Sequence, residues 1–267
     1  MSFRSMRPGL RVSSLLMAAA FSVVLLWIPS ANPAAGQQPP PPPPQKMPDP
    51  MIDDDTGFES IFDGKTLKDW DGDPTYWRVE DGAMVGETTP QTIPQYNRFI
   101  IWRGGTTKDF ELKAEYRISS QGNSGINYRS GELPGVRWVM RGYQADIDGP
   151  EFAKGIRFTG QNYEERVRTF LALRGQLSYI GEGKTPRMVA SLGDNAQLEQ
   201  YVKNDDWNEY HLIVRGNVLI HILNGHVMSV VIDDDTRNRR MDGELGLQVH
   251  VGPPMKVEFR KIRLKKL

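Results

Sequence analysis

The sequence predicts an all-β domain, built as an antiparallel sandwich or barrel. Beyond residue 53, apolar and polar residues alternate with period two in many short runs, which is the pattern of half-buried strands. Gly, Pro, Asn and Asp separate these runs, as expected of turns. One modest helix is predicted, at 195–202. Many short strands with clear turn signals favour two packed sheets or a closed barrel.

Residues 1–36 are typical of a secretory signal peptide. Three arginines precede an apolar run at 12–28, and the small residues at 34–36 suit cleavage. The alternative is a membrane anchor, because a spanning helix needs about 17–25 residues. We expect cleavage and a bacterial protein that is periplasmic or secreted, with no membrane contact afterwards.

Residues 37–52 are expected to form a proline-rich linker, because the unbroken run 39–44 favours an extended polyproline helix. The chain has no cysteine, so an exported domain at 53–267 must be stabilised by its core rather than by disulfides. Formal charges balance over the whole chain, and without the signal's arginines the charge is −3. This weak acidity argues against nucleic acid or an anionic membrane as partner.

The expected strands follow the alternation in order. They are 59–62, 76–79, 83–86, 99–102, 110–118, 125–129, 136–147, 155–159, 170–173, 207–214, 218–223, 226–232, 243–251 and 256–264. Asp81-Gly82 and Asn224-Gly225 can supply the positive φ of tight hairpins. The run Asp233-Asp234-Asp235 follows a strand and is expected to be an exposed turn.

Three expected strands carry short polar side chains on one face and apolar ones on the other. The polar members are Asn127 and Arg129 in the first, Gln144, Asp146 and Asp148 in the second, and Gln248 and His250 in the third. A solvated face normally carries Lys, Glu and Thr, and that remains the alternative. Short, stiff groups hold hydrogen-bond geometry at low entropic cost. We therefore expect these strands to line a sugar-sized concavity, with the amides and Arg129 binding the ligand.

A series of motifs then runs in order along the chain. They are FDGKTLKDW (62–70), WRVEDGAMVGET (77–88), FIIWRGG (99–105), DFELKAEYRI (109–118), GNSGINYRS (122–130), VMRGYQADID (139–148), YEER (163–166), WNEYHLIVRGN (207–217) and GLQVHVGPPMKVEFRKIRL (246–264). With them, residues 57–265 resemble the 3-keto-disaccharide hydrolases, a family formerly described only as a domain of unknown function. Many relatives carry glycines where this chain has Arg166-Val167-Arg168, which leaves the shape of that loop open.

The resemblance implies a concanavalin A-like lectin/glucanase jelly roll, export, and action on oligosaccharides or glycosides whose C3 hydroxyl has been oxidised to a ketone. An upstream sugar 3-dehydrogenase could supply that ketone. The resemblance implies no particular catalytic residues, so the candidates follow from the chemistry of the reaction.

The ketone makes the proton on C2 acidic, so the site needs a base near C2, a donor near the C3 oxygen and an acid near the leaving oxygen. His250 is the first candidate for proton transfer, because its ordinary pKa of about 6.5 lies near working pH. A histidine held for structural reasons fits the pattern equally well. Asp146 and Asp148, about 7 Å apart on one strand face, are the alternative base or its orienting groups.

Cations and further carboxylates complete the candidate site. Arg129, and less strongly Arg103 or Arg141, could stabilise the enolate oxygen, although a structural salt bridge is the alternative for each. Glu164 and Glu165 follow Tyr163 in an expected loop, where they could contact the substrate and supply the acid. A solvated surface pair is the alternative.

No metal and no other cofactor is predicted. Asp146 and Asp148 could bind Ca²⁺, but two carboxylates fall short of its six to eight oxygen ligands. Three functions stay open: an exported hydrolase that cleaves 3-keto-glycosides by proton abstraction, elimination and hydration, a lectin-like binding module without catalysis, and an ordinary glycoside hydrolase. For the last, the acidic row of Asp146, Asp148 and Glu151 gives a superficial match.

Overall fold

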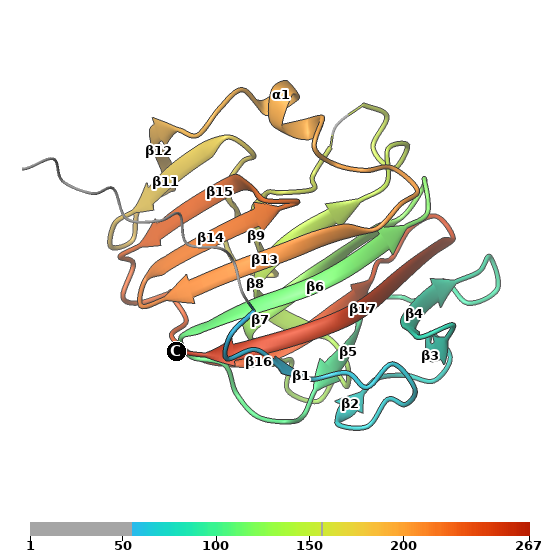
Figure 1. Cartoon of the computed structure of the whole chain (residues 1–267). Coiled ribbons are helices and arrows are strands. Elements are labelled where there is room, and N and C mark those ends of the chain that lie inside the picture. Colours follow the sequence, from blue (N-terminus) through green and yellow to red (C-terminus); the bar gives the residue numbers. More distant parts are fainter. Residues whose placement is uncertain (1–54, 156) are drawn as a thin grey trace, which may run out of the picture. The chain divides into compact units, whose positions relative to one another are not determined.

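The computed structural model describes residues 55–155 and 157–267, which form two β-sheets packed face to face (Figure 1). The all-β two-sheet sandwich predicted from the sequence is thereby confirmed. The expected signal peptide and linker lie outside the described residues. Within the described residues, no helix has the length and apolarity needed to cross a membrane.

The first sheet has ten strands. In spatial order they are β12 (Arg187–Ser191), β11 (Gln176–Ile180), β15 (His226–Asp233), β14 (Val218–Leu223), β13 (Asn208–Arg215), β6 (Phe110–Ile118), β17 (Met255–Lys266), β4 (Ala83–Thr88) and β3 (Trp77–Glu80), with β1 (Glu59–Ser60) also paired to β17. Pairing is antiparallel except between β11 and β15, which are parallel.

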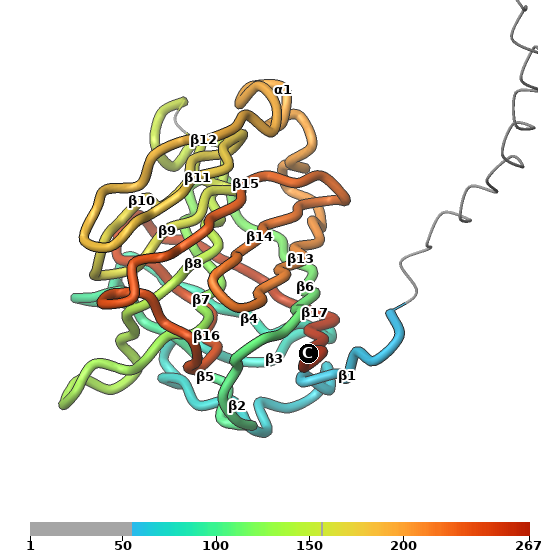
Figure 2. Tube along the Cα trace, turned by 90° about the vertical axis from the view of Figure 1, so that its left-hand side faces the viewer, coloured from blue at the N-terminus to red at the C-terminus, as the bar shows by residue number. Residues whose placement is uncertain are grey.

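The second sheet has seven strands, all antiparallel. Their order is β10 (Thr169–Ala172), β9 (Asn162–Glu165), β8 (Met140–Asp148), β7 (Asn123–Glu132), β16 (Glu244–Val249), β5 (Arg98–Trp102) and β2 (Trp70–Asp71). Figure 2 shows these strands following one another beside the first sheet. The three strands expected to share a polar face, β8, β7 and β16, are direct neighbours.

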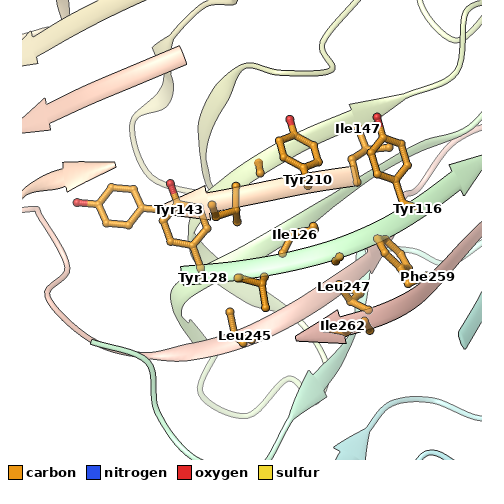
Figure 3. Close-up of a cluster of buried hydrophobic side chains, with 14 of the residues drawn as sticks. Tyr116, Ile126, Tyr128, Tyr143, Ile147, Tyr210, Leu245, Leu247, Phe259 and Ile262 are labelled. Atoms are coloured by element: carbon orange, nitrogen blue, oxygen red, sulfur yellow. The ribbon is translucent and has the colours of Figure 1, made fainter. Parts of the chain in front are cut away.

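The apolar faces of the two sheets meet in one core. From the second sheet it takes Ile126, Tyr143 and Leu247, all on the apolar side predicted by the alternation. Figure 3 shows tyrosines from both sheets within this core, among them Tyr128 and Tyr210. Several of their hydroxyl groups bond to polar groups between the sheets, which buried tyrosines normally require.

Most expected strands are present within one to four residues of their predicted ends. The segment 155–159 is wrong, because its described residues form a loop, not a strand. Strands β2, β9, β11 and β12 were not expected, since they are short or strongly polar. Both turn dipeptides have the predicted positive φ, at 49° and 77° for Asp81-Gly82 and 48° and 81° for Asn224-Gly225.

One helix, α1 (Asn195–Glu199), occurs near the expected position. It is short, and the side chain of Asp194 caps it by accepting hydrogen bonds from the N–H groups of residues 196 and 197. The prediction of an exposed turn at 233–235 is wrong for its outer residues. Asp233 and Asp235 are each 1% exposed, because Arg168 pairs with both carboxylates.

Candidate functional site

A cavity of about 590 Å³ lies on the face of the second sheet that points away from the core. Its walls come from β7, β8, β9, β10, the end of β16, and the connecting segments. The lining residues are Asn97, Asn123, Gln144, Asp146, Phe152, Phe158, Tyr163, Glu165, Arg166, Thr169, Phe170, Gln248 and His250. Five of the candidate residues named from the sequence therefore share one cavity: Gln144, Asp146, Glu165, Gln248 and His250.

Asp146 has the most perturbed carboxyl group in this cavity. It is only 9% exposed, and its carboxylate accepts no hydrogen bond from the described residues. Burial raises its pKa well above the ordinary value, and the negative charges of Asp148 and Glu165 raise it further. Asp146 therefore holds a proton to higher pH than an ordinary aspartic acid.

His250 and Gln248 lie at the end of β16, on the other side of the cavity floor. Burial lowers the pKa of His250, which keeps the imidazole neutral near pH 7. Its Nδ1, and both Nε2 and Oε1 of Gln248, are buried without a hydrogen-bond partner among the described residues. Buried polar atoms are normally paired, so these atoms are available to a ligand.

Glu165 and Asn97 close one end of the cavity. Asn97 donates from Nδ2 to Glu165 Oε1 at 3.2 Å and accepts from the N–H of Val251 at 2.9 Å. It thus links β9 to the segment that carries His250. Burial raises the pKa of Glu165, and the hydrogen bond from Asn97 opposes that rise. Arg166 Nε lies 3.6 Å from Glu165 Oε1.

Gln144 lies over a glycine on the neighbouring strand. Gly125 of β7 pairs with Asp146 of β8, and a Cβ at Gly125 would come 2.0 Å from Gln144 Nε2 and 2.6 Å from its Cγ. Only glycine leaves room for this side chain. A short sequence signal, glycine among polar strand residues, could have indicated such a close approach.

The first sheet supports Asp146 from below. The hydroxyl of Tyr210, on β13, donates to the backbone carbonyl of Asp146 at 2.9 Å. The same hydroxyl accepts from the N–H of Gly160 at 2.8 Å. Tyr210 therefore joins β8 and the loop before β9 to the opposite sheet.

Asp148 does not line the cavity, although it lies on the same strand as Asp146. Its Oδ1 accepts from the N–H and the hydroxyl of Thr159 at 2.8 and 2.6 Å. Arg157 Nε is 3.4 Å from the same oxygen. These contacts hold the loop between β8 and β9, so the geometry favours an anchoring role over a catalytic one.

Glu164 faces away from the cavity and Glu165 faces into it. Arg168 pairs with Glu164 and also reaches Asp233 of β15 at 2.6 Å. The pair forms part of a strand, β9, so its two side chains point to opposite faces. The sequence did not distinguish Glu164 from Glu165, because a loop was expected at this place.

The three arginines proposed for the enolate oxygen lie elsewhere. Arg129 is fully buried, where it donates to the carbonyls of Lys108 and Gly216 at 2.7 Å each and pairs with Asp109 at 2.9 Å. Arg103 pairs with three carboxylates, those of Asp71, Glu132 and Glu244. Arg141 is exposed and outside the cavity wall. The salt-bridge alternative fits Arg129 and Arg103.

Asn127 lies next to the cavity without lining it. It pairs with Gln144 across β7 and β8, is fully buried, and donates to Ser130 Oγ at 3.3 Å. Its Oδ1 has no partner among the described residues. It therefore underlies the polar floor rather than contacting the open space.

Sequence reasoning missed the aromatic and loop residues of the cavity. Phe152, Phe158 and Phe170 lie outside the three strands expected to line the concavity, and Asn97 precedes β5. No group of three or more His, Asp or Glu side chains suited to a metal ion occurs among the described residues.

Comparisons with known proteins agree with this fold. The model of the 3-keto-alpha-glucoside-1,2-lyase-like domain family matches residues 57–265. A 3-keto-disaccharide hydrolase of Bacteroides thetaiotaomicron is 30% identical over 118 residues, which cover 42% of this chain and 37% of that protein. The match thus spans little more than a third of the relative.

Two solved structures from Parabacteroides distasonis, both described as candidate glycosyl hydrolases, share the fold. One has a TM-score of 0.52 at 21% identity, covering 79% of this chain and 94% of that one. The other has a TM-score of 0.52 at 16% identity, covering 79% and 99%. At these identities the likeness concerns the fold alone.

Proposed function

The chain belongs to the family of 3-keto-alpha-glucoside-1,2-lyase-like domains, and on this premise we propose that it cleaves 3-keto-glycosides by elimination followed by hydration. The observation that carries the proposal is the unpaired, buried carboxyl of Asp146, which shares a cavity with the neutral imidazole of His250. Two groups whose environments shift their pKa values in opposite directions are typical of an acid and base pair.

The reaction needs little beyond proton transfer. A base takes the proton from C2, and the electron pair delocalises onto the C3 oxygen as an enolate. The enolate then expels the leaving oxygen from C1, which takes up a proton and departs as an alcohol. Water adds to the resulting C1=C2 bond, so that glycoside plus water gives the 3-keto sugar and the alcohol.

Three residues have roles in this scheme. Neutral His250 is the base for C2, and Asp146, protonated to higher pH than usual, is the acid for the leaving oxygen. The unpartnered Nε2 of Gln248 is a donor for the C3 oxygen. Gln248 takes the place that sequence reasoning gave to the arginines.

An ordinary glycosidase is less well supported. Its expected carboxyl partners, Asp148 and Glu151, do not line the cavity. Asp148 is bonded to Thr159 and Arg157, and Glu151 accepts from Gln121 at 2.8 Å. That chemistry requires a carboxyl pair flanking the bond. The second carboxyl that lines the cavity, Glu165, already accepts a hydrogen bond from Asn97. Export to the periplasm and a dehydrogenase that supplies the ketone are further parts of the proposal.

The proposal predicts release of glucose from 3-keto-trehalose and none from trehalose itself. Asp146→Asn and His250→Gln should each lower kcat by about 10²–10⁴, the usual contribution of a positioned acid or base. The measurement is product release followed by chromatography, with purified wild type and variants.

Asp81→Asn is the matched control, because Asp81 lies in a turn with φ of 49° that asparagine also accepts. It should keep wild-type activity. Binding of the keto sugar with no turnover would instead identify a lectin-like module. Equal cleavage of trehalose and its 3-keto form would favour an ordinary glycosidase.

A further inference from the structure

One wall of the cavity consists of phenylalanine rings. Phe152 and Phe158 come from the loop between β8 and β9, and Phe170 comes from β10. The rings of Phe158 and Phe170 are stacked with centroids 5.9 Å apart, and Phe152 meets Phe158 edge-on at 6.3 Å. We call these three residues the phenylalanine wall.

The phenylalanine wall is continuous with both sides of the site. Tyr163 of β9 packs edge-on against Phe170 at 5.1 Å, and His250 meets Phe152 edge-on at 5.5 Å. The rings therefore form a band from the β10 side of the cavity to the imidazole.

Core packing does not explain these rings. None of the three phenylalanines belongs to the hydrophobic core between the sheets, and Phe170 is 40% exposed. Partly exposed aromatic rings gathered at a cavity are typical of a ligand-binding surface. The loop that carries two of them is held by the bonds from Thr159 and Arg157 to Asp148.

The two halves of the cavity differ in chemistry. The floor offers unpaired polar atoms on Gln248 and His250 and the carboxyl of Asp146. Phenylalanine rings offer no hydrogen-bond donor or acceptor. A second sugar placed against the three rings could contact them only through its C–H groups, because the rings offer its hydroxyl groups no hydrogen-bond partner. A flat apolar ring carries no hydroxyl group that needs a hydrogen-bond partner on this surface.

We propose that the phenylalanine wall binds the leaving group of the substrate, and that this group is an aryl ring joined to C1 through a phenolic oxygen. This rests on the proposed function for the sugar half of the cavity. The C2–H bond breaks, the C1=C2 bond forms, and the C1–O bond releases the phenol. Phenols have a pKa of about 10, as in tyrosine, so a phenolate departs with less help from an acid than an alkoxide does.

Binding and cleavage are measured for 4-nitrophenyl and methyl 3-keto-glucosides in both anomeric forms, with 3-keto-trehalose alongside. Calorimetry on the His250→Gln variant, in which loss of the base for C2 slows turnover of every compound, gives the binding constants. We expect the aryl compound to bind about tenfold or more tightly than the methyl compound. Phe170→Ala should remove most of this preference and leave binding of the methyl compound unchanged, whereas Phe170→Tyr should retain it.

Leu173→Ala is the control, since Leu173 is similarly exposed at 43% and does not line the cavity. Equal binding of both compounds, or equal loss for both in Phe170→Ala, would overturn the aryl assignment and leave the proposed function intact. An aryl preference without cleavage of any 3-keto compound would overturn the proposed function and support the aryl-binding wall.

Discussion

For single residues, the surroundings decide the chemistry more than residue type does. Asp146 and Asp148 are two positions apart on β8. Asp148 is bonded by Thr159 and Arg157, whereas no described residue donates to the Asp146 carboxylate. The hydrogen bonds of Asp148 tie it to the loop before β9, whereas burial without such bonds raises the pKa of Asp146. The same residue type thus serves two purposes within one strand.

The pH dependence of kcat/KM should be bell-shaped. As pH falls, His250 becomes protonated below its ordinary pKa, because burial lowers that pKa, and the base is lost. As pH rises through the raised pKa of Asp146, the acid is lost. Asp146→Asn should retain residual activity with no alkaline limb, as measured by initial rates across pH 4–10. If the alkaline limb is unchanged in that variant, the loss of activity at high pH is due to a group other than Asp146.

At the scale of elements, the site depends on how neighbouring strands fit together. On strand β9, the side chains of Tyr163 and Glu165 point into the cavity, and that of Glu164 points toward the first sheet. Strand β7 contributes the side chain of Asn123 and also a gap, since Gly125 leaves the space that Gln144 fills. A shift of either strand by one residue would exchange these faces.

Gly125→Ala should displace Gln144 and lower kcat/KM for the keto substrate by about tenfold, equivalent to roughly 1.4 kcal/mol of lost transition-state stabilisation. The clash falls on a side chain that can move, so the fold should survive. Gly131→Ala on the same strand is the control, because its Cβ would meet no atom closer than 3.7 Å. Equal activity in the two variants would show that the placement of Gln144 is unimportant.

At the scale of the whole molecule, a buried polar network joins the two sheets. His221 of β14 is fully buried, and its Nε2 lies 2.9 Å from the hydroxyl of Tyr128 on β7 and 3.2 Å from Asn162 Nδ2 on β9. Burial lowers the pKa of His221 to about 3. The network thus contains a histidine that stays neutral in the folded protein at pH values where it is charged in the unfolded chain.

Stability should therefore fall in acid. In the unfolded chain His221 becomes protonated below about pH 6.5, whereas in the folded protein it stays neutral down to about pH 3. The free energy of unfolding therefore decreases as pH falls from about 6.5 to about 3. The loss from His221 between pH 7 and pH 4 should be roughly 3 kcal/mol. The raised pKa values of Asp146, Glu164 and Glu165 act in the opposite direction.

Comparison of variants isolates the histidine. Urea unfolding at pH 7 and pH 4 should show a smaller loss of stability in His221→Gln than in wild type, whatever its absolute stability. His226→Gln, which changes a histidine outside this network, should lose as much as wild type does. If His221→Gln loses as much stability between pH 7 and pH 4 as the wild type does, His221 is not the cause of the loss.

The sequence by itself determined the all-β class and the side of each strand that is buried, because alternation with period two and turn residues act locally. It also placed Gln144, Asp146, Gln248 and His250 on the face that carries the cavity. Tertiary structure decided which polar groups stay unpaired. Asp148, Arg129 and Glu164 found partners on loops or on the other sheet, and the phenylalanine wall joins Phe170 of β10 to Phe152 and Phe158 of a loop. Such long-range pairing depends on contacts between distant residues, which no local pattern contains.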